Sequence, residues 1–325
     1  MTTGACCQQF VRPILIRGRP RLFSIPRGRL LFIAAGWAPP RIRKVGPHAF
    51  EYCGGMIPSR SAHMLTDTLH RVPRAAGRQL LVKRGADGSR ELTAWRLHLP
   101  AGATDDYVAP NEETIIVLQD GRGIFAAGDH SWIVGRSGVF ADRATALYLP
   151  PNTPLRVTAT TDLEAVLVSA ETAEGGKPAI VRSEDVRVNA RGRGDYARDV
   201  HDIFVTDPHA RRLMVGETFN PPGNWSSYPP HKHDGKNGEP VLEEIYYYRV
   251  DPPQGFGHQM QYSADGECVT HVVRDGDAVL LPYGYHPVSA PPGYRLYYLW
   301  AIAGAERRLA LYEDPTHKWI HEIAD

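Results

Sequence analysis

From Leu80 onward the chain alternates short runs of β-favouring residues with turn residues. Gly, Asp, Asn and Pro separate these runs at the spacing typical of hairpins. No long stretch of this region has the 3.6-residue apolar period of an amphipathic helix. The pattern therefore predicts an all-β protein, built as a sandwich or a barrel. The clearest runs are Glu113–Leu118, Ala146–Leu149, Leu163–Val168, Glu244–Tyr248 and Tyr294–Trp300.

Two segments of the first half of this region recur in the second half. Glu112–Leu118 is followed by Leu149–Pro154, and Glu243–Arg249 is followed by Leu281–His286. The distance from the second glutamate of each pair to the first proline is 37 residues in one half and 38 in the other. Because internal repeats of this kind mark repeated structural units, we infer two tandem barrels, at roughly 80–180 and 195–310.

The repeat and a change of composition near residue 64 divide the chain into three parts. We predict an N-terminal extension at 1–63, a first barrel domain at 64–190 and a second at 191–325. The extension holds nine Arg, Lys44 and a single acid, Glu51, whereas the rest of the chain has a net charge of −8. It lacks sustained strand or helix patterning, so we expect a disordered tail or a non-native extension that carries no chemistry. A signal or transit peptide is the alternative.

Composition excludes several classes of protein. A hydrophobic content of 42% and a charged content of 22% are those of a soluble globular protein. The longest apolar run, Leu30–Ala38, is too short to span a membrane, and the acidic body has no footprint for nucleic acid. Only Cys268 lies beyond residue 63, so no oxidising compartment is needed. We predict a cytoplasmic protein, and exposed strand edges favour a homodimer.

Candidate metal ligands cluster in the second half. His231 and His233 lie on one face of a strand, because side chains alternate with a period of two. Glu244 opens a strand farther along, and the turn at 282–286 supplies a third imidazole, His286. Three neutral imidazoles and one carboxylate suit Zn²⁺, Fe²⁺, Mn²⁺ or Ni²⁺. The sequence therefore predicts a divalent-metal site.

Glu243 competes with Glu244 for the role of carboxylate ligand. We prefer Glu244 because it shares a strand face with the tyrosines that follow it. In the first half, Pro154 matches His286 and no His-x-His motif precedes Glu112. We therefore predict that the first barrel lacks the metal and is structural.

These ligand motifs resemble the paired motifs of the cupin superfamily, with a longer insertion than usual between the histidines and the glutamate. More narrowly, six segments are similar to the 5-deoxy-glucuronate isomerase family. The likeness runs from about Gln79 to the C-terminus, and residues 1–63 have no counterpart in it. The six segments are Asn224–Asp234, Glu243–Arg249, Gly255–Gly257, Gly276–Asp277, Pro282–Pro287 and Gly293–Leu299.

The resemblance implies two tandem jelly-roll-like cupin barrels and an activity on a small sugar acid. That activity is the aldose–ketose isomerisation of 5-deoxy-D-glucuronate to 5-dehydro-2-deoxy-D-gluconate, a step of myo-inositol catabolism. Isomerisation of 5-dehydro-4-deoxy-D-glucuronate in pectin breakdown is the alternative. An Fe-dependent dioxygenase and a non-catalytic sugar-acid binding protein are further possibilities, and retention of all four ligands argues against the latter.

Aldose–ketose exchange requires a group that moves a proton near the reacting carbons. The candidates are Tyr246 and Lys236, with Tyr248 or a water at the metal as alternatives. Lys236 lies in a loop predicted near the barrel mouth, where it could instead pair with the substrate carboxylate. Tyrosines on such a strand are often packing residues, so the pattern alone does not decide between these roles.

Four residues are candidates for contacts with the substrate. Tyr248 shares the strand face of Glu244, and Gln259 shares a face with Gln261, from which both amides could bind sugar hydroxyls. Arg249 could bind a carboxylate with two hydrogen bonds, although strand phase turns it away from Glu244.

Overall fold

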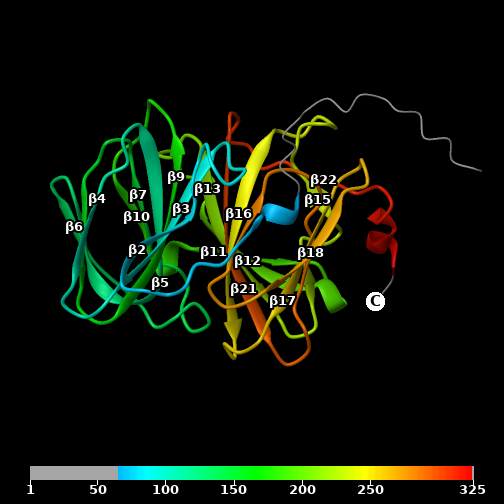
Figure 1. Ribbon diagram of the computed structural model, residues 1–325, viewed down its shortest axis with the longest axis horizontal. Coiled ribbons are helices and arrows are strands. Elements are labelled where there is room, and N and C mark those ends of the chain that lie inside the picture. The colour runs from blue at the N-terminus through cyan, green and yellow to red at the C-terminus, as the bar shows by residue number, and fades with distance from the viewer. Residues whose placement is uncertain (1–64, 324–325) are drawn as a thin grey trace, which may run out of the picture. The chain divides into compact units, whose positions relative to one another are not determined.

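The computed structural model describes residues 65–323, and these residues are built almost entirely from antiparallel strands (Figure 1). The described part of the chain contains no α-helix; its helical elements are four short 3₁₀ turns. None of its helices is long and apolar enough to cross a membrane. The all-β prediction is confirmed, whereas the predictions for residues 1–63 lie outside the described residues. The four turns are η1 (Leu65–Asp67), η2 (Ser183–Asp185), η3 (Gly194–Tyr196) and η4 (Lys318–Glu322).

The first barrel is one connected set of nine strands. Its central strand β5 pairs with β7 and β9 through its first half and with β6 and β8 through its second half. Gly121 lies at the change of partners with φ of 92°, and a Cβ there would lie 2.1 Å from the Asp162 carbonyl oxygen, so only glycine fits. The nine strands are β2 (Gly77–Val82), β3 (Leu92–Leu99), β4 (Thr104–Tyr107), β5 (Glu112–Ala127), β6 (His130–Arg136), β7 (Ala146–Leu149), β8 (Leu155–Ala159), β9 (Leu163–Glu171) and β10 (Ala179–Val181).

The second barrel consists of a seven-stranded sheet, a four-stranded sheet and a separate two-stranded pair. The seven-stranded sheet has the order β1-β19-β16-β21-β13-β12-β11, the four-stranded sheet β14-β20-β17-β18, and β15 pairs with β22. The thirteen strands are β1 (Leu69–His70), β11 (Arg187–Arg191), β12 (Arg198–Phe204), β13 (Leu213–Asn220), β14 (Trp225–Ser226), β15 (His231–Lys232), β16 (Leu242–Asp251), β17 (Gly257–Tyr262), β18 (Cys268–Val273), β19 (Ala278–Leu281), β20 (Val288–Ser289), β21 (Arg295–Gly304) and β22 (Tyr312–Glu313).

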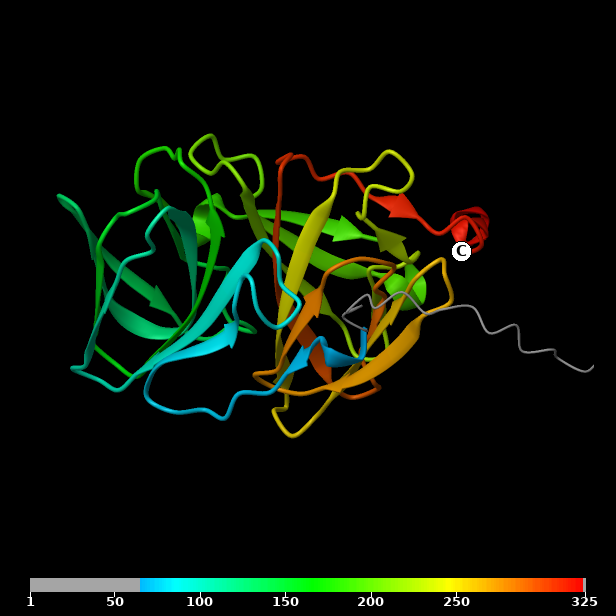
Figure 2. The same cartoon turned by 45° about the horizontal axis from the view of Figure 1, so that its top comes forward.

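The sheets do not divide at the positions predicted from the sequence. β1 precedes the first barrel in the chain but pairs with β19 of the second, and the segment 65–70 lies among the yellow and orange strands in both views (Figures 1 and 2). Conversely, β10 pairs with β7 of the first barrel, whereas β11 already belongs to the sheet of the second. The sheets therefore change over between β10 and β11, before the predicted boundary at residue 190.

The buried apolar side chains form three clusters. One fills the first barrel, one fills the second, and the largest lies between them, where β5 and β9 of one barrel face β16 and β21 of the other. Along β16, Tyr246 and Tyr248 point into the second barrel, whereas Ile245 and Tyr247 point into the shared core. Because both faces of these strands are buried, their sequences read as continuous apolar runs rather than strict alternation.

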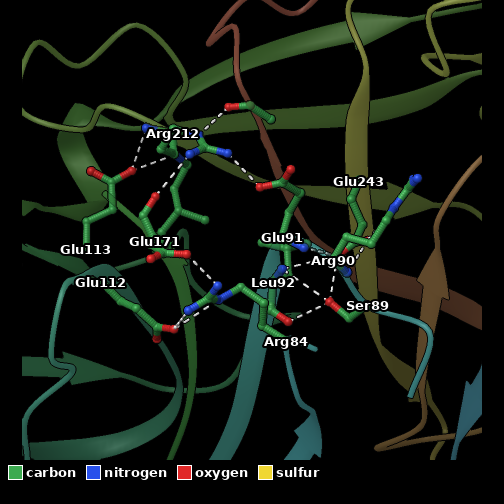
Figure 3. Close-up of polar contacts among 12 residues, drawn as sticks. Arg84, Ser89, Arg90, Glu91, Leu92, Glu112, Glu113, Glu171, Arg212 and Glu243 are labelled. Atoms are coloured by element: carbon green, nitrogen blue, oxygen red, sulfur yellow. Dashed lines mark hydrogen bonds and ion pairs between the residues drawn. The ribbon is translucent and has the colours of Figure 1, made fainter. Parts of the chain in front are cut away.

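Two glutamates tie the barrels together by the same set of contacts, each reaching into the other barrel (Figure 3). The carboxylate of Glu113 accepts backbone N–H groups at the start of β13, from Arg211 at 2.8 Å, Arg212 at 2.6 Å and Leu213 at 2.7 Å. The carboxylate of Glu243 accepts those at the start of β3, from Arg90 at 2.8 Å, Glu91 at 3.0 Å and Leu92 at 3.1 Å, with the Ser89 hydroxyl at 2.6 Å.

This symmetry corrects the alignment of the two halves. Thr114 pairs with Leu149 in the first barrel, and Glu244 pairs with Leu281 in the second. Glu113 therefore corresponds to Glu243, and the position of Glu244 is taken by Thr114. The alignment of Glu112 with Glu243 was wrong by one residue, because linear spacing does not reveal which face of a strand a side chain occupies.

Candidate metal and substrate site

The predicted metal ligands come from three separate parts of the second barrel. β15 carries His231, and His233 follows it directly. The chain then folds back on itself, with the Leu242 N–H donating to the His233 carbonyl at 2.9 Å, so that β16 brings Glu244 beside His233. His286 arrives on the turn between β19 and β20. Residues far apart in the sequence therefore converge inside the barrel.

Three of these side chains form a compact group. The ligand atoms of His233, Glu244 and His286 all lie within 4.8 Å of one another. Glu244 Oε2 lies 3.0 Å from His233 Nε2 and 3.4 Å from His286 Nε2. His231 stands next to the group, with its ring centroid 4.9 Å from that of His286. The structure thus brings the four predicted ligands into one place, three of them tightly.

The distal ring nitrogens of two histidines are held by backbone carbonyls. His233 Nδ1 lies 2.9 Å from the Leu242 carbonyl oxygen, and His286 Nδ1 lies 2.9 Å from that of Gly284. Because each Nδ1 donates to a carbonyl, the Nε2 lone pairs are directed at the centre of the group. Gly284 has φ of 83°, and a Cβ there would lie 2.6 Å from the Tyr262 carbonyl oxygen. Glycine is therefore required in the turn that presents His286.

The electrostatics of the group keep two imidazoles neutral. Burial, assisted by neighbouring His231 and His233, lowers the pKa of His286 well below its usual value. Desolvation together with nearby His233 and Arg198 lowers the pKa of His231 to about 3. Burial acts to lower the pKa of His233, but the hydrogen bond with the Glu244 carboxylate, the charge of that carboxylate and backbone hydrogen bonds together outweigh burial and raise this pKa.

The arrangement fits a divalent cation. His286 Nε2 is buried and has no hydrogen-bond partner among the described residues, which is costly for a polar atom unless a ligand satisfies it. Neutral imidazole nitrogens and one carboxylate are the donors that first-row divalent metals take. The second barrel therefore contains a histidine–glutamate group that could hold a divalent metal ion.

A cavity of about 610 Å³ opens from this group, within the roughly 300–1,000 Å³ of small-molecule sites. His231 and Glu244 form part of its wall, and Tyr246, Tyr298 and Ser227 lie beside them. The C-terminal segment contributes Leu309, Leu311, Glu313 and His321. We call the side chains of His231, His233, Glu244 and His286 the metal group. A molecule in this cavity would contact two members of the metal group, His231 and Glu244.

The comparisons with known proteins agree with this architecture. Residues 71–320 match the KduI/IolB family. The chain belongs to this family. A relative from Geobacillus kaustophilus is 41% identical over 231 residues, covering 69% of this chain and 83% of its own. One from Bacillus subtilis strain 168 is 36% identical over 235 residues, covering 70% and 86%. Both are named 5-deoxy-glucuronate isomerase, so the predicted resemblance is confirmed.

Solved structures of other proteins have a similar fold. An IolB-like protein from Salmonella typhimurium LT2 is 32% identical with a TM-score of 0.75, covering 78% of this chain and 99% of its own. An oxalate decarboxylase from Lactobacillus farciminis is 15% identical with a TM-score of 0.58, covering 83% and 92%. The latter shows the fold alone. The predicted pair of tandem cupin barrels is confirmed.

Tyr246 lies in the cavity wall of this KduI/IolB member, at the end of a chain of hydroxyl groups. Its Oη lies 3.0 Å from Ser227 Oγ, which in turn lies 3.5 Å from Tyr298 Oη. Tyr298 Oη donates to Ser226 Oγ at 2.8 Å. Burial, followed by the charge of Glu244, raises the pKa of Tyr246 well above its usual value, so its hydroxyl is protonated at neutral pH.

The two glutamines and Tyr248 are not among the residues that line the cavity. Gln259 donates from Nε2 to the His286 carbonyl at 3.0 Å and accepts from the Tyr248 hydroxyl. Gln261 donates to the Leu280 carbonyl at 2.9 Å. All three are buried. Gln259 holds the turn that carries His286 through this hydrogen bond. None of the three residues could contact a molecule in the cavity.

The two predicted cationic residues point away from the cavity. Arg249 donates from Nε to Asp275 at 2.9 Å and lies 3.3 Å from Glu164 of the first barrel, so strand phase turns it outward as expected. Lys236 is half exposed and pairs with Asp265 at 3.3 Å. The structure brings neither residue to the metal group.

Two functional features were not found from the sequence. Ser227 and Tyr298, which extend the hydroxyl chain of Tyr246, lie within segments quoted for the family resemblance but were given no role there. Arg191 and Arg198, which line the cavity, had no sequence signal because no motif distinguishes them from the other arginines nearby in the sequence. Only the pairing of β11 with β12 places them at the cavity.

Proposed function

We propose that this chain converts 5-deoxy-D-glucuronate to 5-dehydro-2-deoxy-D-gluconate. The observation that carries the proposal is the cavity in which Glu244 and His231 of the metal group face a space of small-molecule size. The relatives named 5-deoxy-glucuronate isomerase, aligned over more than four-fifths of their own length, support this substrate over the pectin-derived one.

In this proposal His231, His233, Glu244 and His286 hold a divalent cation, with Zn²⁺, Mn²⁺, Fe²⁺ and Ni²⁺ as the candidate ions. When bound, the cation supplies a Lewis acid that polarises the sugar aldehyde. The exposed free thiol of Cys268 accords with an enzyme of the cytoplasm, which is the compartment we propose.

We assign proton transfer at the substrate oxygens to Tyr246. The reaction moves one hydrogen from C2 to C1 and one from the C2 hydroxyl to the C1 oxygen, so no proton is consumed overall. The protonated Tyr246 hydroxyl donates at the C1 oxygen and regains a proton from the C2 hydroxyl, while Ser227 fixes its orientation at 3.0 Å. Apolar side chains of Trp300 and Ile302 in the same wall limit the access of water.

The purified, metal-loaded protein is expected to consume the aldehyde of 5-deoxy-D-glucuronate and to form the 2-deoxy ketose in equal amount. NMR spectroscopy follows both signals in one sample. The pectin-derived 5-dehydro-4-deoxy-D-glucuronate is tested in parallel. Turnover of the pectin-derived sugar alone would assign the other substrate, and turnover of neither would refute the proposal.

Replacing Tyr246 with phenylalanine is expected to lower kcat on the order of 100-fold, the usual contribution of a positioned proton donor, with little change in KM. The metal content, measured by mass spectrometry, should not change. Tyr294→Phe is the matched control, because Tyr294 packs against the barrel core outside the cavity. A Tyr246→Phe variant with full kcat would exclude the hydroxyl from proton transfer.

A further inference from the structure

Three arginines line the cavity, and two of them, Arg191 and Arg198, lie opposite one another on neighbouring strands. Arg191 of β11 and Arg198 of β12 are direct cross-strand partners, so their side chains share one face, and both line the cavity. Like charges placed directly opposite one another destabilise an antiparallel pair. The charge of Arg191 also acts to lower the pKa of Arg198, as expected for neighbouring guanidinium groups.

Arg198 is anchored but not neutralised. Its Nη1 donates to the carbonyl of Tyr196 at 3.0 Å and to that of Tyr228 at 3.1 Å. No carboxylate among the described residues lies within ion-pair distance of it, whereas the half-buried Arg249 pairs with Asp275 at 2.9 Å. Burial lowers the pKa of Arg198, which reflects a partly desolvated charge that the protein leaves uncompensated.

The acids in the cavity wall are already engaged. Asp202 accepts from Asn189 Nδ2 at 2.8 Å, and Glu313 lies 3.1 Å from His321 Nε2. One of the two carbonyls that anchor Arg198 belongs to Tyr228, three residues before His231, and Arg198 and His231 line the same cavity. The cavity thus presents a metal group and a fixed positive charge to the same small molecule.

We propose that Arg198, assisted by the more exposed Arg191, binds the carboxylate of the sugar acid whose aldehyde end faces His231 and Glu244. This inference rests on the proposed function, because it assigns one end of that substrate. A planar guanidinium can bind a carboxylate through two parallel hydrogen bonds, which fixes both position and direction. Arg198 is therefore the residue that selects acids over neutral sugars.

The experiment compares metal-loaded wild type with Arg198→Gln, using 5-deoxy-D-glucuronate and the neutral 5-deoxy-hexose that has CH₂OH in place of the carboxylate. Arg198→Gln should lower kcat/KM for the acid by roughly 100-fold, mainly through KM, because a desolvated charge pair loses one partner. It should leave kcat/KM for the neutral sugar unchanged. Arg191→Gln should also lower kcat/KM for the acid and not for the neutral sugar, but by a smaller factor.

Arg198→Lys should recover only part of the acid preference, because an ammonium lacks the two-bond geometry. Arg295→Gln is the control, since it removes an exposed positive charge from the same barrel outside the cavity. An equal loss with both sugars would show a merely structural role for Arg198. An unchanged preference for the acid would equally overturn the inference.

Failure of the proposed function would appear separately, as wild type that does not convert 5-deoxy-D-glucuronate. The carboxylate site is then tested by calorimetric titration of that sugar acid into chelator-treated wild type and Arg198→Gln. Tighter binding by wild type, absent for the neutral sugar, supports the inference. Equal binding by the two proteins overturns it.

Discussion

Replacing His286 with alanine is expected to remove the bound divalent cation and, with it, turnover of 5-deoxy-D-glucuronate. His286 Nε2 lies 3.4 Å from Glu244 Oε2 and has no other partner among the residues that the structure describes, so the proposed site loses one of its nitrogen donors. Loss of an outer partner already lowers metal affinity by about 10- to 100-fold, and loss of a ligand should cost more. Mass spectrometry of the dialysed protein and NMR of the reaction measure the two effects.

The matched control is His130→Ala, which removes an exposed imidazole from the first barrel. It should keep both metal content and activity. Circular dichroism should show that His286→Ala retains its strands, because the barrel cores lie elsewhere. A folded His286→Ala protein with a full complement of metal would contradict the assignment of His286 as a ligand.

Replacing Glu243 with glutamine is expected to lower the free energy of unfolding by about 3 kcal/mol or more, because buried donors lose an ionised acceptor. The carboxylate is buried and serves three backbone N–H groups and the Ser89 hydroxyl (Figure 3). A glutamine retains one oxygen and turns an N–H₂ group toward donors. Urea-induced unfolding measures the loss.

Glu113→Gln should show a loss of similar size, since Glu113 makes the equivalent contacts to the second barrel. Glu112→Gln is the control, because Glu112 is partly exposed and pairs with Arg84, a contact worth at most about 1 kcal/mol. If Glu243→Gln unfolds at the same urea concentration as wild type, these glutamates do not hold the barrels together.

Much of the fold could be predicted because its signals are local. Strand runs, turn residues and the absence of helical periodicity depend on near neighbours, and they identified the all-β class and two similar halves. The boundary between the halves could not be predicted in the same way. β1 pairs with β19, and β11 with β12, through contacts that depend on which sheet edge is free. Such pairing is a property of the assembled sheets.

The candidate metal ligands could also be predicted from local patterns in the sequence. The alternation of side chains along a strand puts His231 and His233 on one face, and a glycine-containing turn marks the position of His286. The choice of Glu244 over Glu243 depended on strand phase, and the structure shows the two side chains on opposite faces, one in the metal group and one in the other barrel. The sequence repeat was misaligned by one residue, because it matched the structural Glu113 with Glu244 instead of Glu243.

By itself the sequence determined the β class, the repeat and the four residues proposed to bind the metal, since these follow from local periodicity and side-chain chemistry. Only the tertiary structure decided which polar residues face the cavity. Gln259 donates to the His286 carbonyl, Lys236 pairs with a neighbouring loop, and Arg198 lines the cavity from the start of β12. The physical reason is that a long polar side chain takes its direction from the partners around it, and those partners are brought near only when distant strands pair.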